Sequence, residues 1–187
     1  MTDERQLVRN CLKGRQDAQR ELYDRYAGLM LGICYRYTKS LTDAEDVLQD
    51  GFVKVFRHLH TYKFEGELGA WIRRIMVTTA LNFLKKHSRY RTELSFDNND
   101  ALHPVIDSDA EVKMTAREVA ELVRQLPTGY QTIFNLHAVE GFSHVEIGQM
   151  LGISDGTSRS QYARARQLLM SWMETQSMIK TDQYAGK

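Results

Sequence analysis

Hydrophobic residues recur every three or four positions along most of this chain, and no other feature restricts the possible fold as much. This spacing places apolar side chains on one face of an α-helix, whereas a half-buried strand would need them to alternate. The sequence therefore predicts an all-α protein. The first half carries two such sets: Leu22, Tyr26, Leu29, Ile33 and Tyr37, then Leu48, Phe52, Val55 and Leu59.

Signals at helix ends and a change in composition predict two small helical domains. Thr42 and Glu45 have the spacing of a capping box, and the glycine-containing segment 62–69 is the conspicuous internal loop of the first half. Few periodic apolar residues follow Arg91, and Pro104 lies in this stretch, which indicates a linker. We predict a first domain at 1–91, a flexible acidic linker at 92–114, a second domain at 115–175 and a polar tail at 176–187.

Charge is unevenly distributed although the net charge is only +1. Residues 68–92 contain six lysines and arginines and no acid, and residues 93–111 contain six acids and no lysine or arginine. One such run alone can be a solvated face. Two basic zones separated by an acidic connector suit a long polyanion, and we expect the connector to stay off the cationic surfaces.

The second domain contains the parts of a helix-turn-helix. Ser143 and Glu146 have capping-box spacing, Gly152 fits the left-handed position of a sharp turn, and Ser154 can cap the next helix. A plain helical hairpin is the alternative. The inner face of the second helix is predicted to hold Ser158, Tyr162, Ala165 and Leu169.

The outward face of this second helix suits the major groove of DNA. From Gly156 to Met173 the helix has three arginines and no acid, so that it does not repel phosphates. Arginine can donate two hydrogen bonds to guanine, and Ser or Gln can adapt to base edges or phosphate. The residues predicted to face outward are Arg159, Ser160, Gln161 and Arg164.

Four segments occur in a fixed order: DAQRELYDRYAGLM, DAEDVLQDGFVKVF, AWIRRIMVTTALNFLKK, and LPTGYQTIFNL through ARARQLL. In this order and spacing they resemble the sigma-70 family, in particular its extracytoplasmic-function (ECF) group, over nearly the whole chain. The resemblance implies a sigma factor that binds core RNA polymerase, recognises the minus-35 and minus-10 elements of promoter DNA, and melts the DNA. It also implies an anti-sigma factor as a partner.

The resemblance further implies roles for individual residues, each of which alone could be an ordinary solvated position. The polymerase-binding set is Asp46, Gln49 and Asp50. The minus-10 set is Lys63, Phe64, Arg73, Arg74, Thr78, Asn82, Lys85 and Lys86, and the loop 62–69 would hold a flipped base. The minus-35 set is Arg159, Ser160, Gln161, Arg164 and Arg166, of which Arg166 would contact phosphate.

Three positions depart from the family pattern. Thr78 stands where many members carry Asn near the minus-10 face, which leaves the base preference there open. Ser158 and Tyr162 replace commoner aliphatic residues on the inner face of the recognition helix. We therefore expect looser or rearranged packing at that helix.

Two other functions compete with this interpretation. A polymerase-independent helix-turn-helix repressor would explain the second domain but would leave the acidic helix around Asp46 and the first basic segment without a role. An enzyme has less support, because the sequence has no glycine-rich phosphate loop or nucleophile elbow, and His58 and His60 have no third ligand nearby. We expect no catalytic residues, cofactor or metal.

Cellular location is predicted from the cysteines and the hydropathy. Cys11 and Cys34 lie within apolar helical patterns without metal-ligand spacing, which predicts buried free thiols in a reducing compartment. No stretch approaches the ~20 apolar residues of a membrane span. We therefore expect a cytoplasmic protein without membrane insertion.

Overall fold

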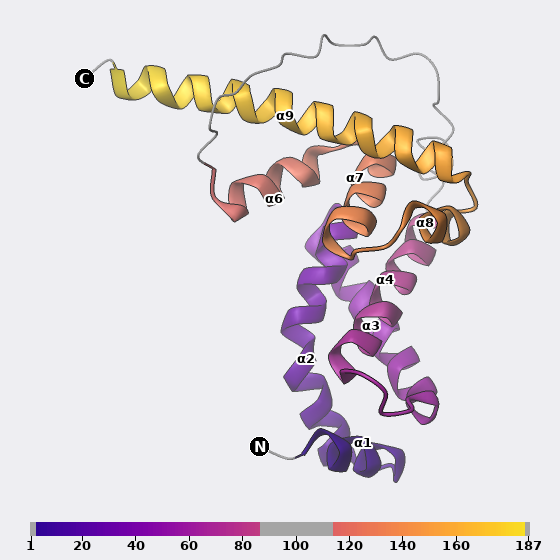
Figure 1. Cartoon of the computed structure of the whole chain (residues 1–187). Helices are drawn as coiled ribbons and strands as arrows, with labels where there is room; N and C mark the ends of the chain where they lie inside the picture. The colour runs from indigo at the N-terminus through magenta and orange to yellow at the C-terminus, as the bar shows by residue number, and fades with distance from the viewer. Residues whose placement is uncertain (1–2, 87–113, 186–187) are drawn as a thin grey trace. The chain divides into compact units, whose positions relative to one another are not determined.

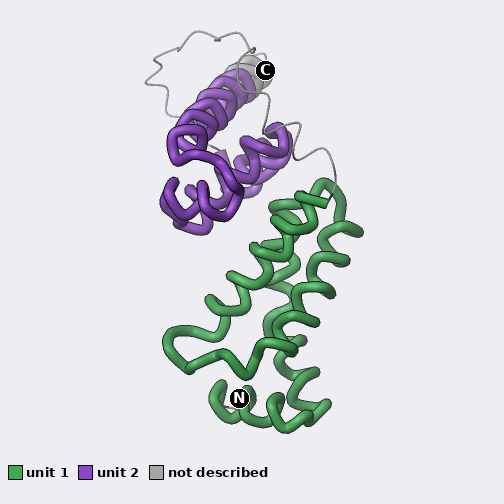
Figure 2. The backbone as a smooth tube through the Cα atoms, turned by 90° about the vertical axis from the view of Figure 1, so that its right-hand side faces the viewer, with its two compact units in different colours: residues 1–88 green, residues 89–187 purple. Residues whose placement is uncertain are grey.

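The computed structural model describes residues 3–86 and 114–185. Every regular element in these ranges is helical, which confirms the predicted all-α fold with two helical regions. The chain divides into two compact units, residues 1–88 and 89–187 (Figure 2). The predicted acidic linker lies almost entirely outside the described residues. None of the described helices is long and apolar enough to cross a membrane.

The first unit is a small bundle. Its elements are α1 (Glu4–Leu12), α2 (Gln16–Tyr37), α3 (Leu41–His58), the 3-10 turn η1 (Leu59–Thr61) and α4 (Leu68–Lys86). Helices α2, α3 and α4 pack against one another (Figure 1). Met30, Val55, Ile72 and Met76 are completely buried between them, because each helix presents one apolar stripe to the other two.

Helix α1 closes one end of this bundle. Leu7 and Val8 are fully buried, and the Tyr26 hydroxyl of α2 donates a hydrogen bond of 2.6 Å to the Glu4 carboxylate. Cys11 and Cys34 are buried and free, as predicted. The unit is therefore held by apolar packing and by polar contacts between its helices.

Two details of the first unit differ from the sequence prediction. Helix α3 is capped by Ser40, whose Oγ accepts from the Asp43 N–H at 3.1 Å, so the predicted Thr42–Glu45 capping box is wrong. Leu29 is 65% exposed, whereas its neighbour Met30 is 0% exposed. Both residues fit steps of three and four from Tyr26, so periodicity cannot separate them and the packing against α3 and α4 decides.

The second unit is built around one long helix. Its elements are α6 (Ala116–Gln125), α7 (Thr128–Phe134), the π-helical turn η2 (Asn135–Val139), α8 (His144–Leu151) and α9 (Asp155–Ala185). Helices α6, α7 and α8 all pack on α9 (Figure 1). Leu122, Leu126, Ala165 and Leu169 form the centre of the core between α6 and α9. Helix α9 continues to Ala185, so the segment predicted as a polar tail is helical to that residue.

Candidate nucleic-acid and polymerase interface

Helices α8 and α9 form the predicted helix-turn-helix. Ser143 and Glu146 make a complete capping box, in which the Ser143 N–H donates to the Glu146 carboxylate at 2.8 Å. Gly152 has a φ of 74° and occupies the left-handed position. The Thr157 N–H donates to Ser154 Oγ at 2.9 Å, which caps α9. All three local signals in the sequence are confirmed.

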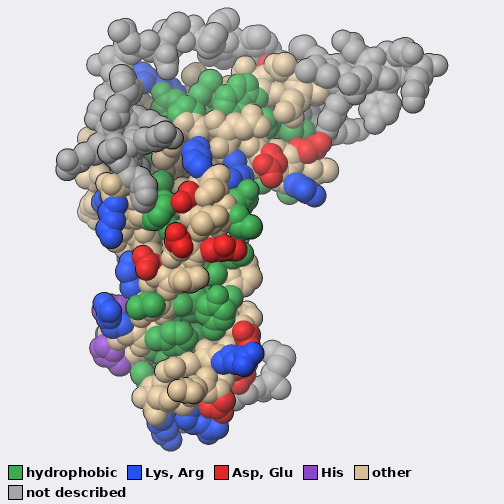
Figure 3. Space-filling model, turned by 180° about the vertical axis from the view of Figure 1, so that it is seen from behind, with side chains coloured by type: hydrophobic (Ala, Val, Ile, Leu, Met, Phe, Trp, Pro, Cys, Tyr) green, Lys and Arg blue, Asp and Glu red, His purple; other side chains and the backbone are tan. Residues whose placement is uncertain are grey.

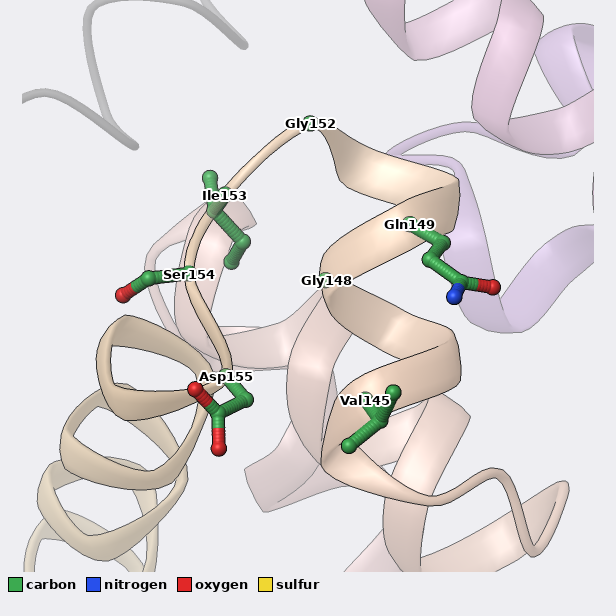
Figure 4. A pocket seen from close by; sticks show the side chains of 7 residues that line it. All are labelled: Val145, Gly148, Gln149, Gly152, Ile153, Ser154 and Asp155. Atoms are coloured by element: carbon green, nitrogen blue, oxygen red, sulfur yellow. The ribbon is translucent and has the colours of Figure 1, made fainter.

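The turn is tight because Gly148 has no side chain. In Figure 4, Gly148 lies on the side of α8 that faces the segment from Ile153 to Asp155. Its carbonyl accepts from the N–H groups of Gly152 and Ile153, at 2.8 and 3.1 Å. A Cβ at Gly148 would lie only 2.8 Å from the Ile153 carbonyl oxygen. The close approach of α8 to the start of α9 therefore depends on this glycine.

The outer face of α9 carries the predicted cations. Arg159, Ser160 and Arg166 are exposed, and Arg164 is half-buried. The Arg159 guanidinium donates to the Asp155 carboxylate one turn earlier, at 3.0 Å. This hydrogen bond holds the pKa of the Asp155 carboxyl below its usual range. Arg159 is thus oriented along the first turn of α9, with its charge only partly compensated at the surface.

Gln161 does not belong to this outer face. The prediction that its side chain faces outward is therefore wrong. Its side chain is only 2% exposed. It lies one turn after the buried Ser158 and one turn before the buried Ala165, so it falls within a wide inner face. The predicted inner stripe is too narrow, because α9 is covered by α6, α7 and α8 together. In this arrangement Gln161 cannot reach a base edge.

The two unusual residues on the inner face of α9, Ser158 and Tyr162, make specific contacts. Ser158 Oγ is hydrogen-bonded to His144 Nδ1 at 2.9 Å. The Tyr162 ring stacks on Phe134 at 5.9 Å and meets His137 edge-on at 4.6 Å. The inner face of α9 therefore packs here through polar and aromatic groups.

A cationic and polar stripe runs along α4. Arg74, Thr78, Asn82 and Lys86 follow one another at four-residue steps, and all four are exposed. Lys85 is also exposed, and Arg73 is half-buried. The Thr78 hydroxyl donates to the Arg74 carbonyl at 2.9 Å, so its proton is used within the helix while its oxygen can still accept.

The loop before α4 is organised by aromatic rings. Tyr62 lies 5.1 Å from the Phe64 ring and 5.6 Å from the Trp71 ring, and its hydroxyl donates to the Gly66 carbonyl at 2.8 Å. Phe64 has a φ of 61°, a backbone conformation that is strained for a residue with a side chain. Lys63 is exposed beside it. The loop thus holds a half-buried aromatic side chain, and Tyr62 links this loop to Trp71 in the first turn of α4.

An acidic and amide-bearing face lies on α3. Asp46, Gln49 and Asp50 are exposed there, while Val47 and Leu48 between them are buried. A shallow groove between α2 and α3 lies beside these residues. Its lining is Tyr23, Ala27, Gly28, Leu31, Glu45, Leu48 and Gln49. On the side of the first unit seen in Figure 3, hydrophobic side chains gather into a patch with acidic side chains at one end.

Sequence reasoning missed the apolar part of this surface. Tyr23 is 36% exposed, and its ring lies 4.6 Å from that of Phe52. Tyr23 follows the buried Leu22 and so lies at the edge of the core stripe of α2. Only this adjacency in the sequence could have indicated that Tyr23 belongs to the surface.

Among the residues that the structure describes, no three His, Cys, Asp or Glu side chains gather as metal ligands would.

Comparison with known proteins identifies the two units. The family model for sigma-70 region 2 matches residues 22–90, and that for sigma-70 region 4 matches residues 116–169. The chain is 30% identical to the ECF RNA polymerase sigma-E factor of Haemophilus influenzae, over 87% of this chain and 91% of that protein. It is 29% identical to the ECF sigma factor SigE of Mycolicibacterium smegmatis, over 84% of this chain but only 62% of the relative.

A solved structure shares the fold. It is the complex of the sigma factor RpoE with the anti-sigma factor NepR from Bartonella quintana, with a TM-score of 0.51 and 18% identity, covering 83% of this chain and 96% of that one. At this identity the similarity concerns the fold alone. The two family matches and the Haemophilus relative establish more: the chain belongs to the ECF group of the sigma-70 family and is a sigma factor of transcription initiation.

Proposed function

We propose that this sigma factor divides promoter recognition between its two units, with α3 reserved for core RNA polymerase. The observation that carries the proposal is the separation of charge within the first unit. Asp46 and Asp50 lie exposed on α3, whereas α4 presents a stripe with cations and no acid. Carboxylates repel phosphate, so the α3 face suits a protein partner and the α4 stripe suits nucleic acid.

For the polymerase, the proposed contact combines α3 with the adjoining groove. Gln49 belongs both to the predicted polymerase-binding set and to the groove lining, so one partner could contact the polar face and the apolar groove together. Burial of apolar groups such as Tyr23 would supply affinity, and the carboxylates would supply orientation.

For the minus-10 element, α4 and the preceding loop act together. Arg74, Lys85 and Lys86 would hold the phosphates of the melted strand, with Arg73, Asn82 and Thr78 along the same helix. An unstacked base would pack in the loop of Lys63 and Phe64, where the aromatic rings offer a stacking surface. Thr78 on α4 would act as a hydrogen-bond acceptor for the same DNA element.

For the minus-35 element, α9 enters the major groove. Arg159 and Arg164 would donate to base edges and Arg166 to phosphate. The Ser160 hydroxyl donates to the Thr157 carbonyl at 3.0 Å, so its oxygen would accept from a base. Gln161 has no part in this contact because it is buried.

Three broader properties belong to the same proposal. The relative from Bartonella quintana is seen with an anti-sigma factor, and we expect a comparable inhibitor for this chain. Sigma factors are non-catalytic regulators, so we expect no turnover when the chain is incubated with nucleotides and metal. Because its partner polymerase works in the cytoplasm, the chain should be found there.

The test compares core polymerase binding of charge-reversed variants. The double variant D46K/D50K should be retained by immobilised core polymerase at least tenfold less than the wild type. Glu121 is an exposed acid on α6, so E121K provides the same type of charge change in the second unit and should bind normally. Equal binding of D46K/D50K and wild type would show that the acidic face of α3 does not contact the polymerase.

The repressor alternative makes a different prediction for the same proteins. A free-standing helix-turn-helix repressor would bind a specific duplex without polymerase, most commonly as a dimer. Its binding to DNA would not depend on the charge of α3. Specific duplex binding by the chain alone, unchanged in D46K/D50K, would favour the repressor.

A further inference from the structure

Two histidine rings are stacked behind the recognition helix. The ring centroids of His137 in η2 and His144 in α8 are 4.2 Å apart, and the planes differ by 22°. The Tyr162 ring of α9 lies 4.6 Å from His137 and 5.7 Å from His144. One cluster of three rings therefore joins η2, α8 and α9.

Hydrogen bonds fix both imidazoles in place. His137 Nδ1 lies 2.8 Å from the Phe142 carbonyl oxygen and must donate to it, because a carbonyl only accepts. His144 Nδ1 is bonded at 2.9 Å to the hydroxyl of Ser158, a residue of α9 that is completely buried. The cluster thus fastens α9 to α8 through Ser158 and Tyr162, the two positions where this chain departs from the aliphatic pattern.

The surroundings of His144 disfavour a positive charge. His137 stacks on it from η2, and on α9 it faces Ser158, Tyr162, Arg159 and Asp155. It is the first residue of α8, where the helix dipole opposes a cation. The nearby Glu146 carboxylate is engaged in the capping box with Ser143.

Most of these influences act in one direction. Burial, the neighbouring His137 and the Arg159 guanidinium lower the pKa of His144, and Asp155 opposes them only in part. Arg159 is also the first proposed base contact of α9, one residue after Ser158. A positive charge on His144 would therefore lie close to the start of the proposed DNA-reading face.

We propose that the His137–His144 pair positions the recognition helix α9 for DNA only while His144 is neutral, so that acidification weakens minus-35 recognition. This inference rests on the proposed role of α9. His144 touches no DNA in it and acts as a positioning residue through Ser158 and Tyr162.

The direction of the pH dependence follows from linkage. The folded-state pKa of His144 is depressed below the value of about 6.5 for an unperturbed histidine. Between the two values the unfolded chain binds more protons than the folded chain. The stabilising contribution of neutral His144 is therefore complete above the unfolded pKa and is lost as the pH falls through the folded pKa.

The first experiment follows the imidazoles in the full chain and needs no polymerase. NMR spectra of the histidine ring carbons between pH 8 and pH 5 should show His144 titrating below the range of an unperturbed histidine. The Tyr162 ring signals should move with the same midpoint. The proposal would be overturned if His144 titrated at or above that range. It would also be overturned if the Tyr162 signals did not change as His144 titrates.

The second experiment measures minus-35 recognition by the holoenzyme on a promoter fragment selected at pH 7.5. Between pH 7.5 and 5.5, wild-type affinity should fall roughly 2- to 30-fold, the range of coupling carried through packed side chains. H144Q remains neutral and can keep a hydrogen bond to Ser158, so its profile should be nearly flat. H58Q changes an exposed histidine of the first unit and should keep the wild-type profile.

The positioning role of His144 and the sigma function can be refuted separately. Identical pH profiles for wild type and H144Q would refute the positioning role while leaving the sigma function intact. If no holoenzyme formed, the proposed function would fail, and the NMR titration would still decide whether His144 resists protonation and whether Tyr162 responds to its charge.

Discussion

Replacing Gly148 by alanine tests the geometry of the helix-turn-helix most sharply. Alanine favours a helix over glycine by about 1 kcal/mol, so a glycine within α8 would ordinarily be improved by G148A. Here the new Cβ would lie 2.8 Å from the Ile153 carbonyl oxygen, closer than real Cβ contacts. This oxygen belongs to the backbone of the tight turn and cannot move independently of it. Overpacking of this kind costs about 1–3 kcal/mol. With the gain in helix propensity subtracted, we expect a net destabilisation of about 1 kcal/mol.

The chain contains a fluorescent reporter for unfolding of the second unit and a second glycine that serves as a control. It has two tryptophans, Trp71 in α4 and Trp172 in α9. In a W71F background, urea unfolding followed by Trp172 fluorescence reports the second unit, since Trp172 packs on its core. The control is G156A, because a Cβ at Gly156 would meet only the Ser154 hydroxyl, at 3.6 Å.

The comparison has one decisive outcome. G148A should unfold at clearly lower urea than the W71F parent, whereas G156A should be unchanged or slightly more stable. The first unit, followed through Trp71 in a W172F background, should not respond to G148A. A G148A protein as stable as G156A would show that α8 and the turn do not approach as closely as described.

Three further experiments test other parts of the account. G32A should stabilise the first unit by about 1 kcal/mol in urea unfolding, because Gly32 lies within α2 and a Cβ there would contact nothing within 4 Å; a loss of stability would contradict the open surface. F64G should be more stable than F64A by about 1 kcal/mol, because both lose the ring but only glycine relieves the positive φ of Phe64; equal stabilities would argue against strain in the loop. D155N should reduce discrimination between bases at the position that we propose Arg159 contacts, since the hydrogen bond that orients the guanidinium is weakened; unchanged selectivity in competition binding would show that Asp155 does not position the Arg159 guanidinium.

Features set by short-range chemistry could be predicted from the sequence. Ser143, Glu146, Gly152 and Ser154 determine the start of α8, the turn and the start of α9 through contacts within a few residues. The capping box of Thr115 and Glu118 at α6 has the same signature and could have been found in the same way.

Features decided by tertiary packing could not be predicted. Leu29 and Met30 fit the same repeat, and only the positions of the neighbouring helices make one exposed and the other buried. Gln161 is buried because three helices cover α9, which the sequence of α9 alone does not reveal. The stack of His137 on His144 joins η2 to α8, two elements whose approach is set by the tertiary packing.

The central claim is that this chain docks on core RNA polymerase and directs it to promoters. The most direct measurement adds the purified full chain to core polymerase and fragmented genomic DNA, and maps the 5′ ends of the transcripts. We expect defined start sites that share sequence elements near minus-35 and minus-10 and that disappear with D46K/D50K. Failure of the chain to associate with core polymerase at low salt, or transcripts with scattered starts, would contradict the account.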